Sequence, residues 1–162
     1  MAGFFKGVEE SKVGLGGIYF LANRGPGHTD KEPNWLPALY TVEIVKLITM
    51  TSRKKDDLFI LEAKILESDC AERKPGMTAS WVVNLKQDAA LGNIKGFIAA
   101  ANGIDPGDES AVNEAVTEEV CELAVSEDQP LAGEKVRLEC VMIKTREGKP
   151  FTLHRWSPYK EA

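Results

Sequence analysis

The chain is poor in the residues from which catalytic and metal sites are usually built. It has only two histidines, His28 and His154, and their separation is not that of a metal-binding pair. The glycines at Gly14, Gly16 and Gly17 are not followed by the Lys-Ser/Thr of a Walker A loop, and no G-x-S-x-G nucleophile elbow is present. The sequence therefore predicts a protein that is not an enzyme, with no catalytic residues, no metal and no cofactor.

Cysteine and long apolar runs are scarce as well. The three cysteines, Cys70, Cys121 and Cys140, are odd in number and far apart, so we expect reduced thiols rather than a disulfide or a zinc site. No apolar run approaches the ~18 residues that span a membrane. Residues 1–6 lack the apolar stretch and cleavage site of a signal peptide. These absences predict a cytoplasmic protein that does not contact a membrane.

What the chain does contain is strand-like alternation of apolar and polar residues, interrupted once by a helical block. The predicted strands are 39–48, 58–67, 78–85, 135–144 and 151–156, and the helical block covers about 88–128. Five strands with a helix after the third is the order of an OB-fold. The predicted fold is mainly β with helices (α+β), an OB-fold-like five-stranded Greek-key barrel with a helical insertion between strands 3 and 4.

The chain divides by composition into two parts. Residues 1–37 are rich in glycine and proline and are predicted to be a flexible N-terminal arm and a loop, and 38–162 form the OB-fold-like domain. In the second strand, one face is apolar and is expected to line the interior: Phe59, Leu61, Ala63 and Ile65. The first strand loses its alternation after Val45, which predicts a bulge or a sharp bend.

Charge is distributed unevenly. The net charge of −5 does not suggest a nucleic-acid-binding protein, but 105–128 holds nine acids and no Lys or Arg. The remaining 16 acids face 20 bases, so the strands and their loops are mildly basic. The helix predicted over 108–128 has two interpretations. It is either a solvated surface, or a device that repels phosphates from the wrong side or competes with them for a basic groove.

The basic residues gather in the loops between predicted strands, where an OB-fold binds its ligand. Lysines in turns also serve solubility alone, but three basic loops on one barrel favour a track for phosphates. The predicted contacts are Arg53, Lys54 and Lys55 in the first loop, Lys64, Arg73 and Lys74 on and after the second strand, and Lys144, Arg146, Lys149 and Arg155 around the last hairpin.

Aromatic residues are the candidates for base stacking, which contributes roughly 1–3 kcal/mol per base. The candidate platforms are Trp35, Tyr40, Trp81, Trp156 and Tyr159. Tyr40 and Trp81 share the parity of core residues, and core packing is the alternative for both. Trp35 lies among prolines and is either a platform or a plug at one barrel end. Trp156 has the opposite parity from Phe151 and Leu153, which favours a ligand contact.

Several segments together resemble small bacteriophage proteins regarded as OB-fold single-stranded DNA-binding proteins. The residues concerned are Ser52-Arg53-Lys54-Lys55 with the strand from Phe59 to Ser68, Pro75-Gly76 with Ser80-Trp81-Val82-Val83-Asn84-Leu85, Leu91-Gly92-Asn93-Ile94-Lys95-Gly96-Phe97, and the last hairpin with Gly148 and Trp156-Ser157-Pro158. The similarity covers about 38–160. The chain departs from such proteins in ending without an acidic, aromatic-tipped tail, which puts recruitment of partners by a tail in doubt.

The resemblance implies a non-catalytic single-stranded DNA-binding protein of phage DNA replication or recombination, acting in the cytoplasm of a bacterial host cell. Its expected partners are single-stranded DNA and replication or recombination proteins, and self-association into a homo-oligomer stays open. Two alternatives remain. One is a structural or protein-interaction module, such as a virion or assembly protein, and the other is an unrecognised enzyme. Salt-dependent binding of an unstructured oligonucleotide separates the first interpretation from the second.

Overall fold

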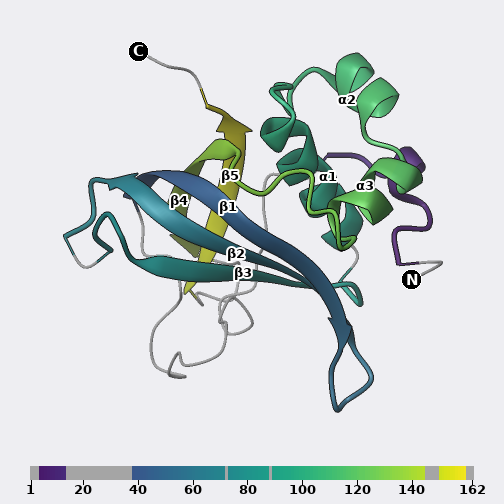
Figure 1. The fold of residues 1–162 in the computed structure, drawn as a ribbon, viewed down its shortest axis with the longest axis horizontal. Coiled ribbons are helices and arrows are strands. Elements are labelled where there is room, and N and C mark those ends of the chain that lie inside the picture. The colour runs from purple at the N-terminus through teal and green to yellow at the C-terminus, as the bar shows by residue number, and fades with distance from the viewer. Residues whose placement is uncertain (1–3, 14–37, 72, 88, 145–149, 160–162) are drawn as a thin grey trace.

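The computed structural model describes residues 4–13, 38–71, 73–87, 89–144 and 150–159. The strands are β1 (Ala38–Thr51), β2 (Asp57–Ser68), β3 (Thr78–Asn84), β4 (Lys135–Lys144) and β5 (Pro150–Pro158). They form one antiparallel sheet in the order β3-β2-β1-β4-β5 (Figure 1). All five lie where the alternation of the sequence predicts them, within three residues at either end. The prediction of a mainly β protein with helices between its third and fourth strands is confirmed.

The central strand, β1, pairs with β4 through its first half and with β2 along most of its length. The register with β2 shifts between Ile44 and Lys46, so that Val45 has no partner, and this is the predicted bulge. A bulge bends its strand and increases the local twist. The long β1–β2 hairpin is correspondingly curved, and its turn projects beyond the end of β3 (Figure 1).

Closure of the sheet into a barrel is not seen. Within the described residues, no ladder joins β3 to β5, and these two are the edge strands. The edges nevertheless approach each other, because the ring centroids of Trp81 in β3 and Trp156 in β5 are 5.1 Å apart. The sheet is therefore open but strongly curled.

A cluster of aromatic rings fills the space inside this curl. Phe97, from α1 (Ala90–Ala101), contacts both tryptophans, with ring centroids 5.7 Å from Trp81 and 4.8 Å from Trp156. Phe59 of β2 lies 6.2 Å from both Trp81 and Phe97, and Phe5 lies 6.2 Å from Phe59. Pairs with such tilted or edge-on geometry contribute ~0.5–1.5 kcal/mol each beyond the area they bury.

The interior predicted for the second strand is confirmed. Phe59, Leu61, Ala63 and Ile65 are all fully buried and belong to one apolar core. Helix α1 is buried on nearly every side, because the sheet covers one side and the shorter helices and N-terminal segment cover the other (Figure 1). A mainly apolar helix is expected in such a position, and in α1 the polar exceptions are Asn93 and Lys95.

The single acidic helix expected over 108–128 is wrong, because two short helices occupy this region. They are α2 (Glu109–Ala115) and α3 (Glu118–Ala124). The chain is extended at Val116, and the Thr117 hydroxyl accepts a hydrogen bond from the Val120 N–H (3.2 Å), which caps a new helix. The start of α2 is as predicted, since Asp108 caps it through the N–H of Ala111. None of the helices in the described ranges is long and apolar enough to cross a membrane.

The N-terminal residues 4–13 also differ from the expected flexible arm. They form a packed segment with the 3-10 helix η1 (Val8–Glu10), and Phe5 and Val8 are buried in the core. Lys95 of α1 fixes this segment in place. Its buried ammonium donates hydrogen bonds to the carbonyl oxygens of Glu9 (3.0 Å) and Ser11 (2.9 Å) and to Asn113 Oδ1 of α2 (2.7 Å). Burial lowers the pKa of Lys95, and the three acceptors offset that cost.

We expect Lys95→Ala to lower the free energy of unfolding by about 2–4 kcal/mol, since it removes charge-assisted hydrogen bonds from a buried group. Urea unfolding measures the loss. The matched control is Lys12→Ala, which removes an exposed lysine from the same segment and should cost less than ~0.5 kcal/mol. Equal stability of the two variants would contradict the proposed anchoring of 4–13 by Lys95.

Trp156→Ala should lower the free energy of unfolding by ~3–5 kcal/mol, as truncation of a large buried aromatic does. Its neighbour Arg155 is exposed, and Arg155→Ala should cost less than ~1 kcal/mol. Thermal melts of both variants make the comparison. A Trp156→Ala protein as stable as Arg155→Ala would show that the ring is not part of the core.

Candidate nucleic-acid interface

The turn between β1 and β2 presents three consecutive basic side chains at the tip of the projecting hairpin. The Ser52 N–H donates to the Asp56 carbonyl (2.8 Å), and the Lys55 N–H donates to the Ser52 carbonyl (2.9 Å). The Ser52 Oγ accepts a further bond from the Asp56 N–H (3.1 Å). Arg53, Lys54 and Lys55 are exposed on this braced turn, as the sequence predicts for phosphate contacts.

Lys55 closes the turn in a left-handed conformation, with φ 63°. A three-residue hairpin turn of this kind requires a left-handed residue at its last position, and glycine is the residue that adopts it without steric cost. A lysine here costs stability on the order of 1 kcal/mol. A strained residue at an exposed basic tip is the kind of outlier that points to a functional position.

The base of the tip is fixed by an ion pair that sequence reasoning missed. Lys86, just after β3, lies 2.7 Å from Asp56 Oδ1, and Asn84 donates to Asp56 Oδ2 (3.3 Å). The hydrogen bond from Lys86 lowers the pKa of Asp56, so this carboxylate stays ionised. With Lys86 beside it, the turn has four bases in its vicinity: Arg53, Lys54, Lys55 and Lys86. The acids there are Asp56 and Asp57.

The second predicted basic loop does not join the first. Arg73 and Lys74 lie in the turn between β2 and β3, at the opposite end of the 12-residue β2, roughly 36 Å away at the usual rise per residue. Successive turns of an antiparallel meander lie at alternate ends. These two turns therefore lie at opposite ends of the sheet, and the phosphate contacts expected of Arg73 and Lys74 stay a prediction. Trp35, Arg146 and Lys149 lie outside the described residues, and so does the side chain of Lys144.

Lys64 lies between the two ends, exposed on the sheet face that points away from the core. Glu43 of β1 is directly opposite Lys64, and on the same face Lys46 is opposite Glu62. Opposite charges at facing positions attract each other. The middle of this outer face is therefore close to neutral.

A groove of about 620 Å³ crosses the outer face where β1, β4 and β5 run side by side. Its charged lining residues are two bases, Arg137 of β4 and Arg155 of β5, and three acids, Glu67, Asp69 and Glu139. Arg155 lies 3.5 Å from Glu139, and both side chains are about half exposed. An exposed pair of this kind is worth only ~0–1 kcal/mol, so a phosphate can displace the carboxylate at little cost.

Tyr159 lies beside this groove and carries cations on its ring. Lys135 Nζ is 5.2 Å and Arg137 Cζ is 5.8 Å from the ring centroid, both within cation–π range. The sequence predicts Tyr159 and Arg155 as contacts but misses Lys135 and Arg137. The signal was present, because Lys135, Arg137 and Glu139 alternate with the buried Val136 and Leu138 and so must face outward.

Two of the predicted stacking residues are corrected by the structure. Trp81 is fully buried and Trp156 is 6% exposed, so neither ring offers a face to a base. Tyr40 is 2% exposed, which confirms the alternative of core packing, and burial raises the pKa of its hydroxyl. Of the candidate platforms that the structure describes, Tyr159 alone has a partly exposed side chain. The alternation of residues along β5 placed Trp156 on the wrong face, because the sequence does not show which face of β5 packs against α1.

The possible metal ligands and the thiols of the described residues are the remaining candidate groups. No three His, Cys, Asp or Glu side chains among them come together as a metal site. The three cysteines are free thiols, as expected. Burial raises the pKa of Cys121 to about 12 and that of Cys140 well above its usual value. Thiols of this kind are protonated and inert at neutral pH.

No protein-family model matches the chain, and no curated protein matches its sequence. The function is therefore inferred from two basic surfaces. One is the hairpin tip, defined by Arg53, Lys54, Lys55 and Lys86. The other is the β4–β5 strip, defined by Lys135, Arg137, Arg155 and Tyr159.

We expect Lys55→Gly to raise the free energy of unfolding by ~0.5–1 kcal/mol, because glycine adopts the left-handed conformation without strain. Lys54→Gly removes the same charge at a position without positive φ and should instead lose about that amount. Urea unfolding of both variants gives the two signs. A Lys55→Gly protein less stable than the wild type would show that the turn is not strained at this residue.

Proposed function

We propose that this protein binds single-stranded DNA, without strong sequence preference and without catalysing a reaction. The observation that carries the proposal is the exposed Arg53-Lys54-Lys55 tip, which keeps a lysine at a position suited to glycine. Three adjacent cations on a braced hairpin match a backbone of closely spaced phosphates. Contacts to phosphates give affinity without reading sequence.

The sheet supports an OB-fold-like domain as the scaffold for this activity. In the order β3-β2-β1-β4-β5, pairing of the two edges would close a five-stranded barrel, and Trp81 and Trp156 already bring those edges together. The OB-fold is a partly open barrel that binds oligonucleotides through its strand 2–3 face and through the loops after strands 1 and 4. The hairpin tip is the first of those loops.

The proposed binding mode relies on charge more than on stacking, since Trp81 and Trp156 are buried. A strand of DNA would contact the hairpin tip and the β4–β5 strip, and one base would stack on Tyr159. Arg137 pairs with Thr41, so the two surfaces are about 33 Å apart along β1 at the usual rise per residue. OB-folds engage roughly 4–16 nucleotides, which suits a span of this size.

The acidic helices favour one side of the molecule for DNA. Helices α2 and α3 pack beyond α1 from the sheet (Figure 1), so their carboxylates repel phosphates from that side. The resemblance in the sequence supports a setting in phage DNA replication or recombination, in the cytoplasm of a bacterial host, with proteins of those processes as partners.

A protein-interaction module is the second candidate. Among the residues that the structure describes, it is favoured by five large apolar side chains that are exposed: Leu39, Val45, Met50, Met77 and Leu123. They are scattered over the sheet and helices, and single exposed apolar residues are common on soluble proteins. This observation therefore weighs less than the basic tip, and it predicts no salt-dependent affinity for an oligonucleotide.

Replacing Arg53, Lys54 and Lys55 together with alanine should weaken binding of a fluorescent dT oligonucleotide. It should also flatten the slope of log K against log salt by ~0.7 for each phosphate that the variant no longer neutralises. Fluorescence anisotropy at several salt concentrations measures both. The control is Lys6→Ala/Lys12→Ala, which removes exposed lysines outside both basic surfaces and should leave the slope nearly unchanged. Unchanged affinity and slope in a folded triple variant would remove the hairpin tip from the proposal.

A further inference from the structure

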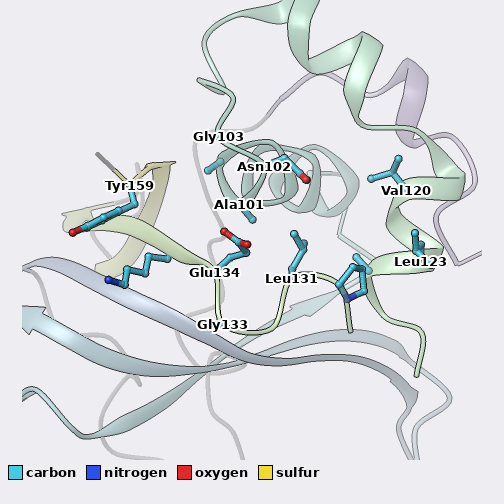
Figure 2. A pocket seen from close by; sticks show the side chains of 13 residues that line it. Ala101, Asn102, Gly103, Val120, Leu123, Leu131, Gly133, Glu134 and Tyr159 are labelled. Atoms are coloured by element: carbon cyan, nitrogen blue, oxygen red, sulfur yellow. The ribbon is translucent and has the colours of Figure 1, made fainter. Parts of the chain in front are cut away.

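A second groove, of about 760 Å³, lies among the helices and away from both basic surfaces except at Lys135 and Tyr159 (Figure 2). Its walls are the end of α1 at Ala101–Gly103, the side of α3 with Val120 and Leu123, and the chain that leads into β4 with Leu131. Leu123 is 50% exposed on α3. Leu123 is not isolated, because it shares the wall of one groove with Val120 and Leu131, and the three form an apolar lining.

The wall formed by 129–134 is held to β1 by hydrogen bonds, which continue the sheet ahead of the first residue of β4. The Gly133 N–H donates to the Ile44 carbonyl (2.8 Å), and the Ile44 N–H donates to the Glu134 carbonyl (2.8 Å). The side chain of Gln129 accepts from the Leu47 N–H (2.8 Å) and donates to the Leu47 carbonyl (2.7 Å), as a neighbouring strand would. The groove is therefore pre-formed, which lowers the cost of binding.

Acids outnumber bases in the segments that form the groove, and the lining itself holds one acid, Glu134, and one base, Lys135. Residues 105–134 contain ten acids and no Lys or Arg. Glu134 lines the groove itself, and Glu119 is exposed one turn before Leu123 on the same side of α3. The C-terminal end of α1, at Asn102 and Gly103, adds the negative end of a helix dipole. Among the described lining residues Lys135 is the one base, and it lies over the ring of Tyr159.

We propose that this groove binds a basic amphipathic segment of another protein. Apolar side chains of that segment would contact Leu123, Val120 and Leu131, and flanking Lys or Arg side chains would face Glu119, Glu134 and the end of α1. An apolar face laid into a groove, with complementary charge at the rim, is a recurring mode of peptide recognition. Away from Lys135 and Tyr159, nucleic acid and anionic lipid do not fit, because Glu119 and Glu134 repel phosphate.

The test uses a fluorescent helical peptide of leucines and lysines, with leucine at every third or fourth position. We expect binding in the micromolar range, weakened about tenfold or more by Leu123→Lys, which removes the anchor and adds a positive charge. Met77→Lys makes the same charge change at an exposed apolar residue outside the groove and should change the affinity less than about twofold. Both side chains are substantially exposed, so both variants should fold, and a thermal melt confirms this.

Two further comparisons separate the groove from general acidity. Glu119→Gln/Glu134→Gln should weaken peptide binding severalfold, whereas Glu109→Gln/Glu114→Gln, which removes two exposed acids from α2, should not. A peptide with its lysines replaced by glutamate should not bind. Equal effects of the paired variants, or binding of the glutamate peptide, would overturn the proposal. So would self-association that Leu123→Lys abolishes, because a second copy would then be the occupant.

The proposal can be tested separately from DNA binding. Neither Leu123 nor Glu119 belongs to the hairpin tip or the β4–β5 strip. Leu123→Lys should therefore leave the affinity for a dT oligonucleotide within about twofold of that of Met77→Lys, which carries the same net charge. A tenfold difference between the two would show that the groove is part of the DNA-binding surface and would overturn its assignment to a protein partner.

Discussion

The contact between Trp81 and Trp156 is the interaction on which the rest of the structure depends. These rings lie on the two edge strands, and their contact brings the edges of an open, curled five-stranded sheet close together. Phe97 contacts both rings, so the same cluster fixes α1 inside the curl. Helix α1 in turn holds the N-terminal segment through Lys95. Because Tyr159 follows Trp156 by three residues, the cluster also positions the aromatic residue at the surface.

The same constraint decides how the protein can bind a ligand. Tryptophans that close a core are not available for stacking on bases, so the candidate interface consists mainly of cations on a braced hairpin and on β4 and β5. An interface of this kind is sensitive to salt and tolerant of sequence. The acidic helices α2 and α3 lie beyond α1 from the sheet (Figure 1), so their carboxylates are not on the outer face of the sheet. Under the proposed function, this placement lets a chain with a net charge of −5 present the basic hairpin tip to DNA.

The strands were predictable because each has one face in the core, which imposes alternation on the sequence. The bulge at Val45 was predictable for the same reason. Contacts between distant segments were not. The sequence around Lys95 does not show that it hydrogen-bonds to the carbonyl oxygens of Glu9 and Ser11, 86 and 84 residues earlier. The glycines near Phe5 suggested a flexible arm, although Phe5 is buried. Trp156 is buried because α1 packs against its face of β5. The alternation of residues within β5 does not specify that face. The break before α3 had a local signal, since Thr117 is a good helix cap following a β-branched residue.

Under the proposed function, DNA binds to the outer face of the sheet through the two basic surfaces. Titration of the isotope-labelled protein with a short dT oligonucleotide, followed by amide chemical shifts, tests it most directly. The account predicts shifts in the turn from Ser52 to Asp56 and around Arg137, Arg155 and Tyr159, which diminish as salt is added. Amides of α2 and α3 should not move. The absence of shifts at low salt, or shifts confined to α2 and α3, would contradict it.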